Sequence, residues 1–149
     1  MLGIHSTTMG FIAGFVGEEI ERQVKQLGID TDFIKIENDT SRINVKILTE
    51  LEETAINSIG PFIDQISMKL LLQKIEKIQG EDTLILAGSI PQGVSENIYQ
   101  NICEKLSSKG TRIMVDATGD LLLNTLPFHP FLIKPNQEEL GEIFHIKIL

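Results

Sequence analysis

Apolar residues near the start of the chain form a continuous run that is followed by a helical repeat. Residues 9–16 (MGFIAGFV) are apolar apart from two glycines, which is typical of a strand covered on both faces. Apolar positions then recur at helical spacing over residues 20–27, behind two glutamates that favour a helix start, and Gly28 ends the repeat. The pattern predicts one strand followed by one helix.

The pattern changes between residues 33 and 57. Three short stretches alternate apolar and polar residues, and they are separated by Asn38-Asp39 and by a glutamate-rich turn. Alternation of this kind is typical of strands with one wet face. We therefore expect an antiparallel excursion over 33–57.

Strands and helices alternate through the rest of the chain. The predicted strands cover 83–88, 112–117 and 131–133, and the predicted helices cover 68–78, 98–106, 120–126 and 137–144. Because β-α alternation builds a parallel sheet covered by helices, the predicted fold class is α/β.

Composition and charge restrict the functions that such a chain can have. The 149 residues are 42% hydrophobic and 23% charged, as expected for one soluble globular domain. A net charge of −8 without a cluster of Lys or Arg argues against nucleic acid and anionic membranes as partners. Cys103 is the only cysteine, and neither a signal peptide nor an apolar run of membrane-spanning length is found, so we expect a cytoplasmic protein.

Polar residues follow three of the predicted parallel strands. Gly88 and Ser89 come after the strand at 83–88, Asp116 closes the next strand, and Lys134 follows the last. Ligands of open α/β sheets bind beyond the carboxyl ends of the strands, so these positions form a candidate site. Each also has a structural interpretation, because the first pair suits a turn and Asp116 suits a helix cap.

The segment after the last strand has the same two interpretations. Asn136 and Glu139 lie at the spacing of a helix N-cap and its third residue, so they could serve only to start a helix. They could also face a ligand at the sheet edge. The residues alone leave both interpretations open.

Five segments together resemble the ribokinase-like (PfkB) sugar kinases. They are GFIAGFVG (10–17), SRINVKI (41–47), LAGSIPQG (86–93), VDATGDLL (115–122) and FLIKPNQEELGEIF (131–144). The resemblance covers essentially the whole chain, and the string RINVK with a later IN-x-x-GP turn is similar to the fructose 1-phosphate branch. It implies a three-layer α/β/α fold with a mainly parallel sheet, in which 1–149 is part of one domain and 33–57 is a small antiparallel β lid.

The resemblance implies a nucleotide site after the last strand. In this family the Asn-x-x-Glu pair helps to hold Mg²⁺, largely through water, beside the phosphates of ATP, which is the phosphoryl donor. Asn136 and Glu139 would have that role, and Lys134 would lie near the nucleotide phosphates. Asp116 would border the same magnesium region.

The resemblance places the sugar phosphate on other residues. Gly88 and Ser89 match the loop that lines the sugar site, where glycine lets a backbone approach and a hydroxyl can bond. Arg42 and Asn44 lie on the expected lid, and the Arg42 guanidinium is suited to bind a phosphate.

Two motifs of the family do not occur in this sequence. One is an upstream strand with a sugar-binding Asp and a Gly-Gly motif, and the other is a Gly-Ala-Gly-Asp string that carries the catalytic base. Asp120, in the nearest similar string, occupies the position of an ordinary middle element. We therefore expect a central portion of a kinase, truncated at both ends, without a catalytic base and inactive alone.

The expected activity of the parent protein is phosphorylation of fructose 1-phosphate to fructose 1,6-bisphosphate with MgATP. Tagatose 6-phosphate is an alternative acceptor. A second hypothesis is a non-catalytic module that binds nucleotide or sugar phosphate, or that pairs with another chain. Because one face of the predicted lid strands needs a cover, the pairing expected is a homodimer through these strands.

Overall fold

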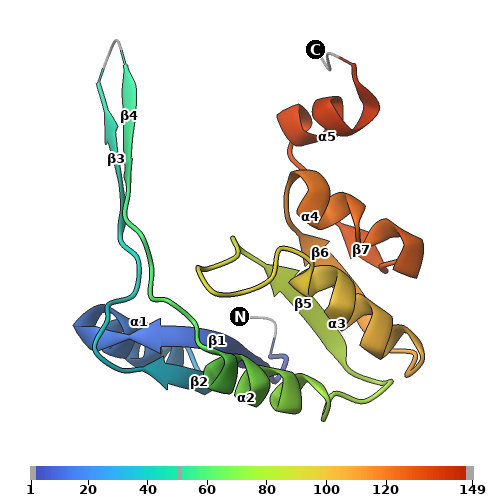
Figure 1. Ribbon diagram of the computed structural model, residues 1–149, viewed down its shortest axis with the longest axis horizontal. Coiled ribbons are helices and arrows are strands. Elements are labelled where there is room, and N and C mark those ends of the chain that lie inside the picture. The colour runs from blue at the N-terminus through green and yellow to red at the C-terminus, as the bar shows by residue number, and fades with distance from the viewer. Residues whose placement is uncertain (1–2, 50–51, 147–149) are drawn as a thin grey trace. The chain divides into compact units, whose positions relative to one another are not determined.

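The computed structural model describes residues 3–49 and 52–146, which form two compact units (Figure 1). The first unit contains the chain up to Leu71 together with Pro91–Gly93. The second contains Leu72–Ile90 and the chain from Val94 onward. Each unit has buried apolar residues of its own and is described by itself.

The first unit begins with two parallel strands joined by a helix. Strand β1 (Thr7–Ala13) leads into helix α1 (Gly14–Gln26), and β2 (Asp30–Ile36) then pairs with β1 in parallel. Ile12, Ala13 and Ile34 are buried in this unit. Gly28 has a φ of 74° and ends the helix, as the sequence predicted.

Two sequence predictions are wrong in this unit. The first strand ends at Ala13 instead of Val16, because Gly14 adopts a φ of 57° and the helix begins there. The strand at 33–36 is not part of an antiparallel excursion, since it pairs with β1 in parallel. Its alternating burial reflects a parallel strand covered on one face only.

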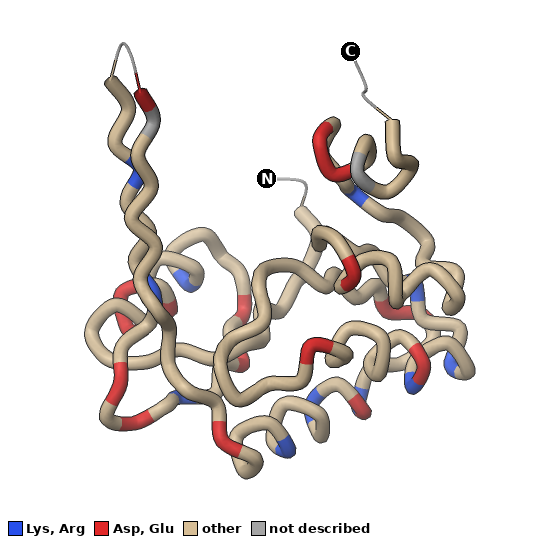
Figure 2. The backbone as a smooth tube through the Cα atoms, turned by 45° about the horizontal axis from the view of Figure 1, so that its top comes forward, with Lys and Arg blue, Asp and Glu red and all other residues tan. Residues whose placement is uncertain are grey.

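An antiparallel hairpin follows β2. It consists of β3 (Asn44–Leu48) and β4 (Glu53–Asn57), with Val45 opposite Ile56, while residues 50 and 51 of the expected 33–57 excursion lie outside the described residues. Figure 1 shows the hairpin as a separate two-stranded ribbon. Figure 2 shows that most of its length is uncharged.

The second unit contains a three-stranded parallel sheet. Its strands are β5 (Thr83–Ala87), β6 (Arg112–Asp116) and β7 (Leu132–Ile133), in the order β5-β6-β7. The helices around it are α3 (Ile98–Ser107), α4 (Gly119–Leu123), the short 3-10 helix η1 (Leu126–Phe128) and α5 (Gln137–Phe144), while α2 (Gln65–Ile75) runs from the first unit into the second. The expected α/β class, with parallel strands and a small antiparallel sheet, is confirmed.

The core of the second unit lies between α3 and the sheet. Ile102, Cys103 and Leu106 of α3 are buried, as are Val115 of β6 and Leu122 of α4. The sequence predicts a parallel sheet covered by helices, but β5 is covered on one face only in this unit, because Leu86 is buried whereas Ile85 is 62% exposed. Within residues 3–49 and 52–146, none of the helices combines the length and the hydrophobicity that a membrane span needs.

Candidate functional site

The parallel register brings the carboxyl ends of the three strands to one edge of the sheet. Ala87 of β5 is aligned with Asp116 of β6, and Val115 of β6 is aligned with Ile133 of β7. The residues that follow β5 and β7 therefore flank Asp116 in space. This adjacency is what the sequence predicted from the alternation of strands and helices.

Asp116 and Lys134 form an ion pair at this edge. The Lys134 Nζ lies 3.0 Å from Oδ1 of Asp116, and the Lys134 backbone N–H donates to the Val115 carbonyl at 3.0 Å. The Lys134 side chain is 70% exposed and the Asp116 side chain is 44% exposed, so neither charge is buried. The pair is accessible from solvent, and its lysine can exchange one anionic partner for another without the cost of leaving a buried charge unpaired.

Asn136 and Glu139 form a reciprocal capping box at the start of α5. The Glu139 N–H donates to Oδ1 of Asn136 at 2.9 Å, and the Asn136 N–H donates to Oε2 of Glu139 at 2.7 Å. The helix-start interpretation of this pair is therefore realised in the structure. It does not exclude a ligand role, because the box engages one carboxylate oxygen of Glu139 and leaves Oε1 for a water or a cation.

The loop after β5 accepts a hydrogen bond from Tyr99, a residue that the sequence did not mark as functional. The Tyr99 hydroxyl, at the start of α3, donates to the Gly88 carbonyl at 3.1 Å. Burial, and secondarily the negative charge of Asp116, raises the pKa of Tyr99 to about 12. The apolar repeat that predicts this helix consists of Ile98, Ile102 and Leu106 and does not include Tyr99. The one available signal was that Tyr99 is the only tyrosine of the chain.

Arg42 and Asn44 lie in the first unit, at the base of the hairpin, and both side chains are exposed. The segment before Arg42 is fixed by Ser41, which accepts a hydrogen bond from the Ala13 N–H on Oγ and donates its own N–H to the Ala13 carbonyl, both at 2.9 Å. Within the described residues, no carboxylate forms an ion pair with Arg42. Its guanidinium is therefore available to an anion, on a backbone that is well anchored.

The donor set at the sheet edge suits a hard cation held through water. Asp116, Asn136 and Glu139 each offer a side-chain oxygen, as Mg²⁺ prefers, and all three already have hydrogen-bond or ion-pair partners. Among residues 3–49 and 52–146, no cluster of three His, Cys, Asp or Glu side chains could form a closed metal site. These residues fit a magnesium ion that keeps several waters and also binds phosphate oxygens.

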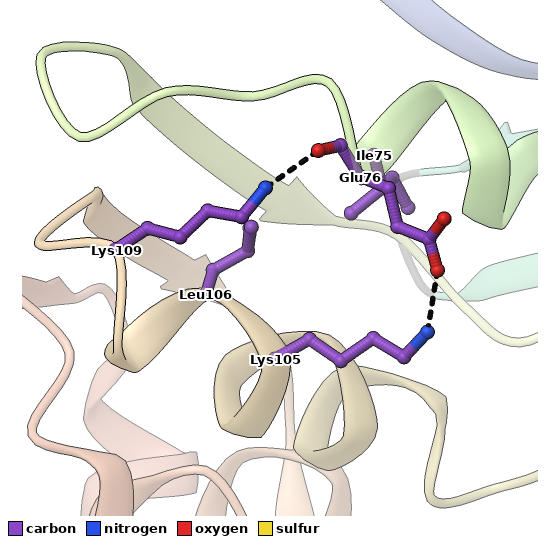
Figure 3. Close-up of a pocket in the computed structure, with 5 residues that line it drawn as sticks. All are labelled: Ile75, Glu76, Lys105, Leu106 and Lys109. Carbon is purple, nitrogen blue, oxygen red and sulfur yellow. Dashed lines mark hydrogen bonds and ion pairs between the residues drawn. The ribbon is translucent and has the colours of Figure 1, made fainter.

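A small pocket lies elsewhere in the second unit, beside the C-terminal end of α3 (Figure 3). Lys105 pairs with the Glu76 carboxylate at 2.8 Å, and Lys109 donates to the backbone carbonyls of Glu76 and Ile78. Both lysines that line the pocket therefore bind the segment that directly follows α2, and they stabilise the C-terminal end of that helix. Because α3 leads from the carboxyl end of β5 to the start of β6, this pocket is at the opposite edge from the candidate site.

Comparison with known proteins identifies a family and relatives with the same fold. The model of the pfkB family carbohydrate kinases matches residues 1–148. The 1-phosphofructokinase of Bacillus subtilis is 38% identical over 95% of this chain, and the D-tagatose-1-phosphate kinase of Bacillus licheniformis is 36% identical over 98% of it. A Staphylococcus aureus structure described as a candidate phosphofructokinase is 38% identical over 99% of the chain, with a TM-score of 0.82.

The matched region is only part of each relative. It spans 46% of the Bacillus subtilis protein, 47% of the Bacillus licheniformis protein and 48% of the Staphylococcus aureus chain. This chain thus spans about half the length of the relatives that it matches. On this evidence the chain belongs to the pfkB family of carbohydrate kinases.

Proposed function

We propose that the protein containing this chain transfers the γ-phosphoryl group of ATP to a ketose phosphate, with fructose 1-phosphate as the preferred acceptor and fructose 1,6-bisphosphate as the product. The observation that carries this proposal is the 38% identity with a 1-phosphofructokinase over 95% of the chain. The polar edge of the β5-β6-β7 sheet supports it, because its cationic and oxygen-rich groups suit a nucleotide with its magnesium ion.

The second unit would contribute the nucleotide side of the site. Lys134 would exchange its ion pair with Asp116 for contacts to the ATP phosphates, and Asp116 would then face the magnesium region. Glu139 would bind magnesium-coordinated water through the oxygen that the capping box leaves, with Asn136 beside it. The bound ion would supply charge neutralisation on the transferred phosphoryl group.

Arg42 would bind the phosphate already present on the acceptor, since a guanidinium matches phosphate oxygens bidentately. Asn44, Gly88 and Ser89 would bind the sugar. In the reaction, the bond from the γ-phosphorus to the bridging oxygen of ATP breaks, and a bond forms to the C6 hydroxyl oxygen of fructose 1-phosphate. The hydroxyl proton passes to a base, ADP leaves, and none of the residues of this chain is proposed as that base.

The test is a coupled assay of ADP release on this chain and on a version extended at both ends from its source gene. The acceptors are fructose 1-phosphate, fructose 6-phosphate, tagatose 1-phosphate and tagatose 6-phosphate, each with MgATP. We expect the extended protein to turn over fructose 1-phosphate fastest and the 149-residue chain to be inactive. Failure of the extended protein to phosphorylate any ketose phosphate would overturn the proposal.

Tagatose phosphates are included because a relative of nearly equal identity is named D-tagatose-1-phosphate kinase. A tagatose 1-phosphate or tagatose 6-phosphate kinase is therefore the second candidate within the same reaction class. The ratio of kcat/KM values among the four acceptors decides between them, because specificity is a ratio of these constants.

A non-catalytic role is favoured by one observation, the exposed apolar face of the β3–β4 hairpin. Ile43, Val45, Ile47 and Ile56 are 50%, 45%, 48% and 56% exposed. A homodimer through these strands would cover the face. Sedimentation of the chain and of an Ile47→Lys variant tests this idea, which requires that the lysine shift a dimer toward monomer.

A further inference from the structure

We propose that Tyr99 is a positioning residue for the acceptor loop, whose hydroxyl holds the Gly88 carbonyl so that the Ser89 N–H faces the ligand side of the sheet edge. The inference rests on the proposed function. Tyr99 does not itself contact the substrate in this account. It acts through the peptide group that joins Gly88 to Ser89.

The hydrogen bond from the Tyr99 hydroxyl to the Gly88 carbonyl, which we call the tether, starts from a residue of helix α3. The Tyr99 hydroxyl oxygen lies 3.1 Å from the Gly88 carbonyl oxygen, and the tyrosine is 8% exposed on α3. A buried phenol needs a polar partner, and Gly88 supplies it. The side chain therefore links the first turn of α3 to a loop 11 residues earlier in the chain.

The orientation of the Ser89 amide follows from the planarity of the peptide group. In a trans peptide the carbonyl and the next N–H point to opposite sides, and the described residues contain no cis peptide bond. Holding the Gly88 carbonyl toward Tyr99 therefore directs the Ser89 N–H away from α3. Within the described part of the chain, neither the Ser89 N–H nor its hydroxyl has a protein hydrogen-bond partner.

The backbone at Gly88 shows why the loop needs such a tether. Gly88 has a φ of 96°, a region that side-chain-bearing residues rarely adopt, and a Cβ placed there would meet no atom within 4 Å. No atom packs against the position where a Cβ of residue 88 would stand. The Tyr99 hydroxyl donates to the Gly88 carbonyl and so favours one direction of this peptide group.

The location of the loop connects this tether to the acceptor. Gly88 directly follows Ala87, which is aligned with Asp116 at the carboxyl edge. A polar hydrogen of fixed direction at that edge suits an oxygen of the sugar or its phosphate, because an oriented donor binds without first paying an ordering cost. The expected consequence of losing the tether is therefore weaker binding of the acceptor, with the nucleotide little affected.

The test uses Tyr99→Phe in the extended protein, with Thr125→Val as the matched control. Thr125 is 0% exposed and donates its hydroxyl to the Leu122 carbonyl at 2.7 Å, so this variant also removes one buried hydroxyl from the same unit. We expect Tyr99→Phe to raise KM for fructose 1-phosphate by about tenfold, the effect of one hydrogen bond, while KM for ATP stays within about twofold. Thr125→Val should leave both KM values unchanged.

A second measurement does not depend on any variant folding. Hydrogen exchange of the Ser89 amide in the unaltered protein should slow when fructose 1-phosphate is added, and it should not respond to ATP alone. An amide that exchanges at the same rate with and without the acceptor would overturn the inference. So would a Tyr99→Phe variant that loses thermal stability but keeps its KM for the acceptor.

The outcomes separate this inference from the function on which it rests. If the unaltered extended protein neither binds nor phosphorylates a ketose phosphate, the proposed function fails and this inference fails with it. If the unaltered protein is active and Tyr99→Phe has the same acceptor KM, only the role of Tyr99 is refuted.

Discussion

The carboxyl edge of the β5-β6-β7 sheet and the β3–β4 hairpin differ in how their side chains are satisfied. At the edge, Asp116 is paired with Lys134, and Asn136 with Glu139, above a core that includes the fully buried Leu122. The hairpin presents Val45 and Ile47 to solvent. The side chains of the edge are already paired without a ligand, whereas the hairpin leaves an apolar face exposed to solvent.

The largest expected effect compares core truncations in the two regions. Leu122→Ala should lower the free energy of unfolding by about 3 kcal/mol, because the side chain is 0% exposed and leaves a cavity. Ile47→Ala should change it by less than about 0.5 kcal/mol, because Ile47 is 48% exposed. Urea unfolding followed by circular dichroism measures both, and equal losses would mean that the hairpin is packed in solution.

An alkaline titration tests whether the side chains of Tyr99 and Cys103 in α3 are buried in the folded chain. Burial raises the pKa of Tyr99 to about 12 from an ordinary 10.0, and that of Cys103 to about 11 from 9.0. Both groups bind their protons more tightly when folded, so their contribution to stability is complete below about pH 9 and is lost as the pH rises toward 12.

Tyrosinate absorbance follows one group, since Tyr99 is the only tyrosine and tryptophan is absent. We expect its midpoint to fall from about 12 in the folded chain to about 10 in concentrated urea. The Tyr99→Phe variant supplies the blank. A folded-state midpoint near 10 would mean that the phenol is solvated, contrary to its position in α3.

Two substitutions of Glu139 separate its structural role in the capping box from its proposed role at the magnesium ion. Glu139→Ala should destabilise the chain by about 1 kcal/mol, because the Asn136 N–H loses its acceptor, whereas glutamine can keep the box. In the extended protein, Glu139→Gln should lower turnover and raise the magnesium concentration required. A normal magnesium requirement in that variant would remove Glu139 from the proposed metal environment.

A small effect on stability is expected at the ion pair between Asp116 and Lys134. Asp116→Asn should change the free energy of unfolding by roughly 0 to 1 kcal/mol, since both partners are more than one third exposed and are screened by water. Thermal melts at low and high salt measure the change. A much larger loss would show that the pair is a structural element, which would weaken its assignment to the nucleotide side of the site.

The sequence predicted those helix ends and strands that are determined by residues close together in the chain. Gly28 follows the end of α1 with a φ of 74°, as predicted, and the strands around Leu86 and Val115 were placed from apolar runs. The parallel direction of β5, β6 and β7 followed from the helices between them. The adjacency of Asp116 and Lys134 was therefore accessible from sequence, whereas the distance between their side chains was not.

One wrong prediction depended on a contact between residues that are distant in the sequence. The strand at 33–36 alternates because only one of its faces is covered, so its pattern could not reveal a parallel neighbour. Tyr99 and Ser41 each bond a backbone group far along the chain, at Gly88 and Ala13. Periodicity assigns such residues to a face of an element, but it carries no information about which distant peptide they hold.

The buried thiol of Cys103 makes the chain well suited to selective chemical labelling. It is the only cysteine, it is 0% exposed, and its pKa of about 11 leaves on the order of one thiolate in ten thousand molecules at neutral pH. Alkylating reagents attack the thiolate and will therefore spare it. A cysteine introduced at Val45 or Ile47 would be the single reactive position, and its rate of alkylation would report directly whether the apolar face is covered.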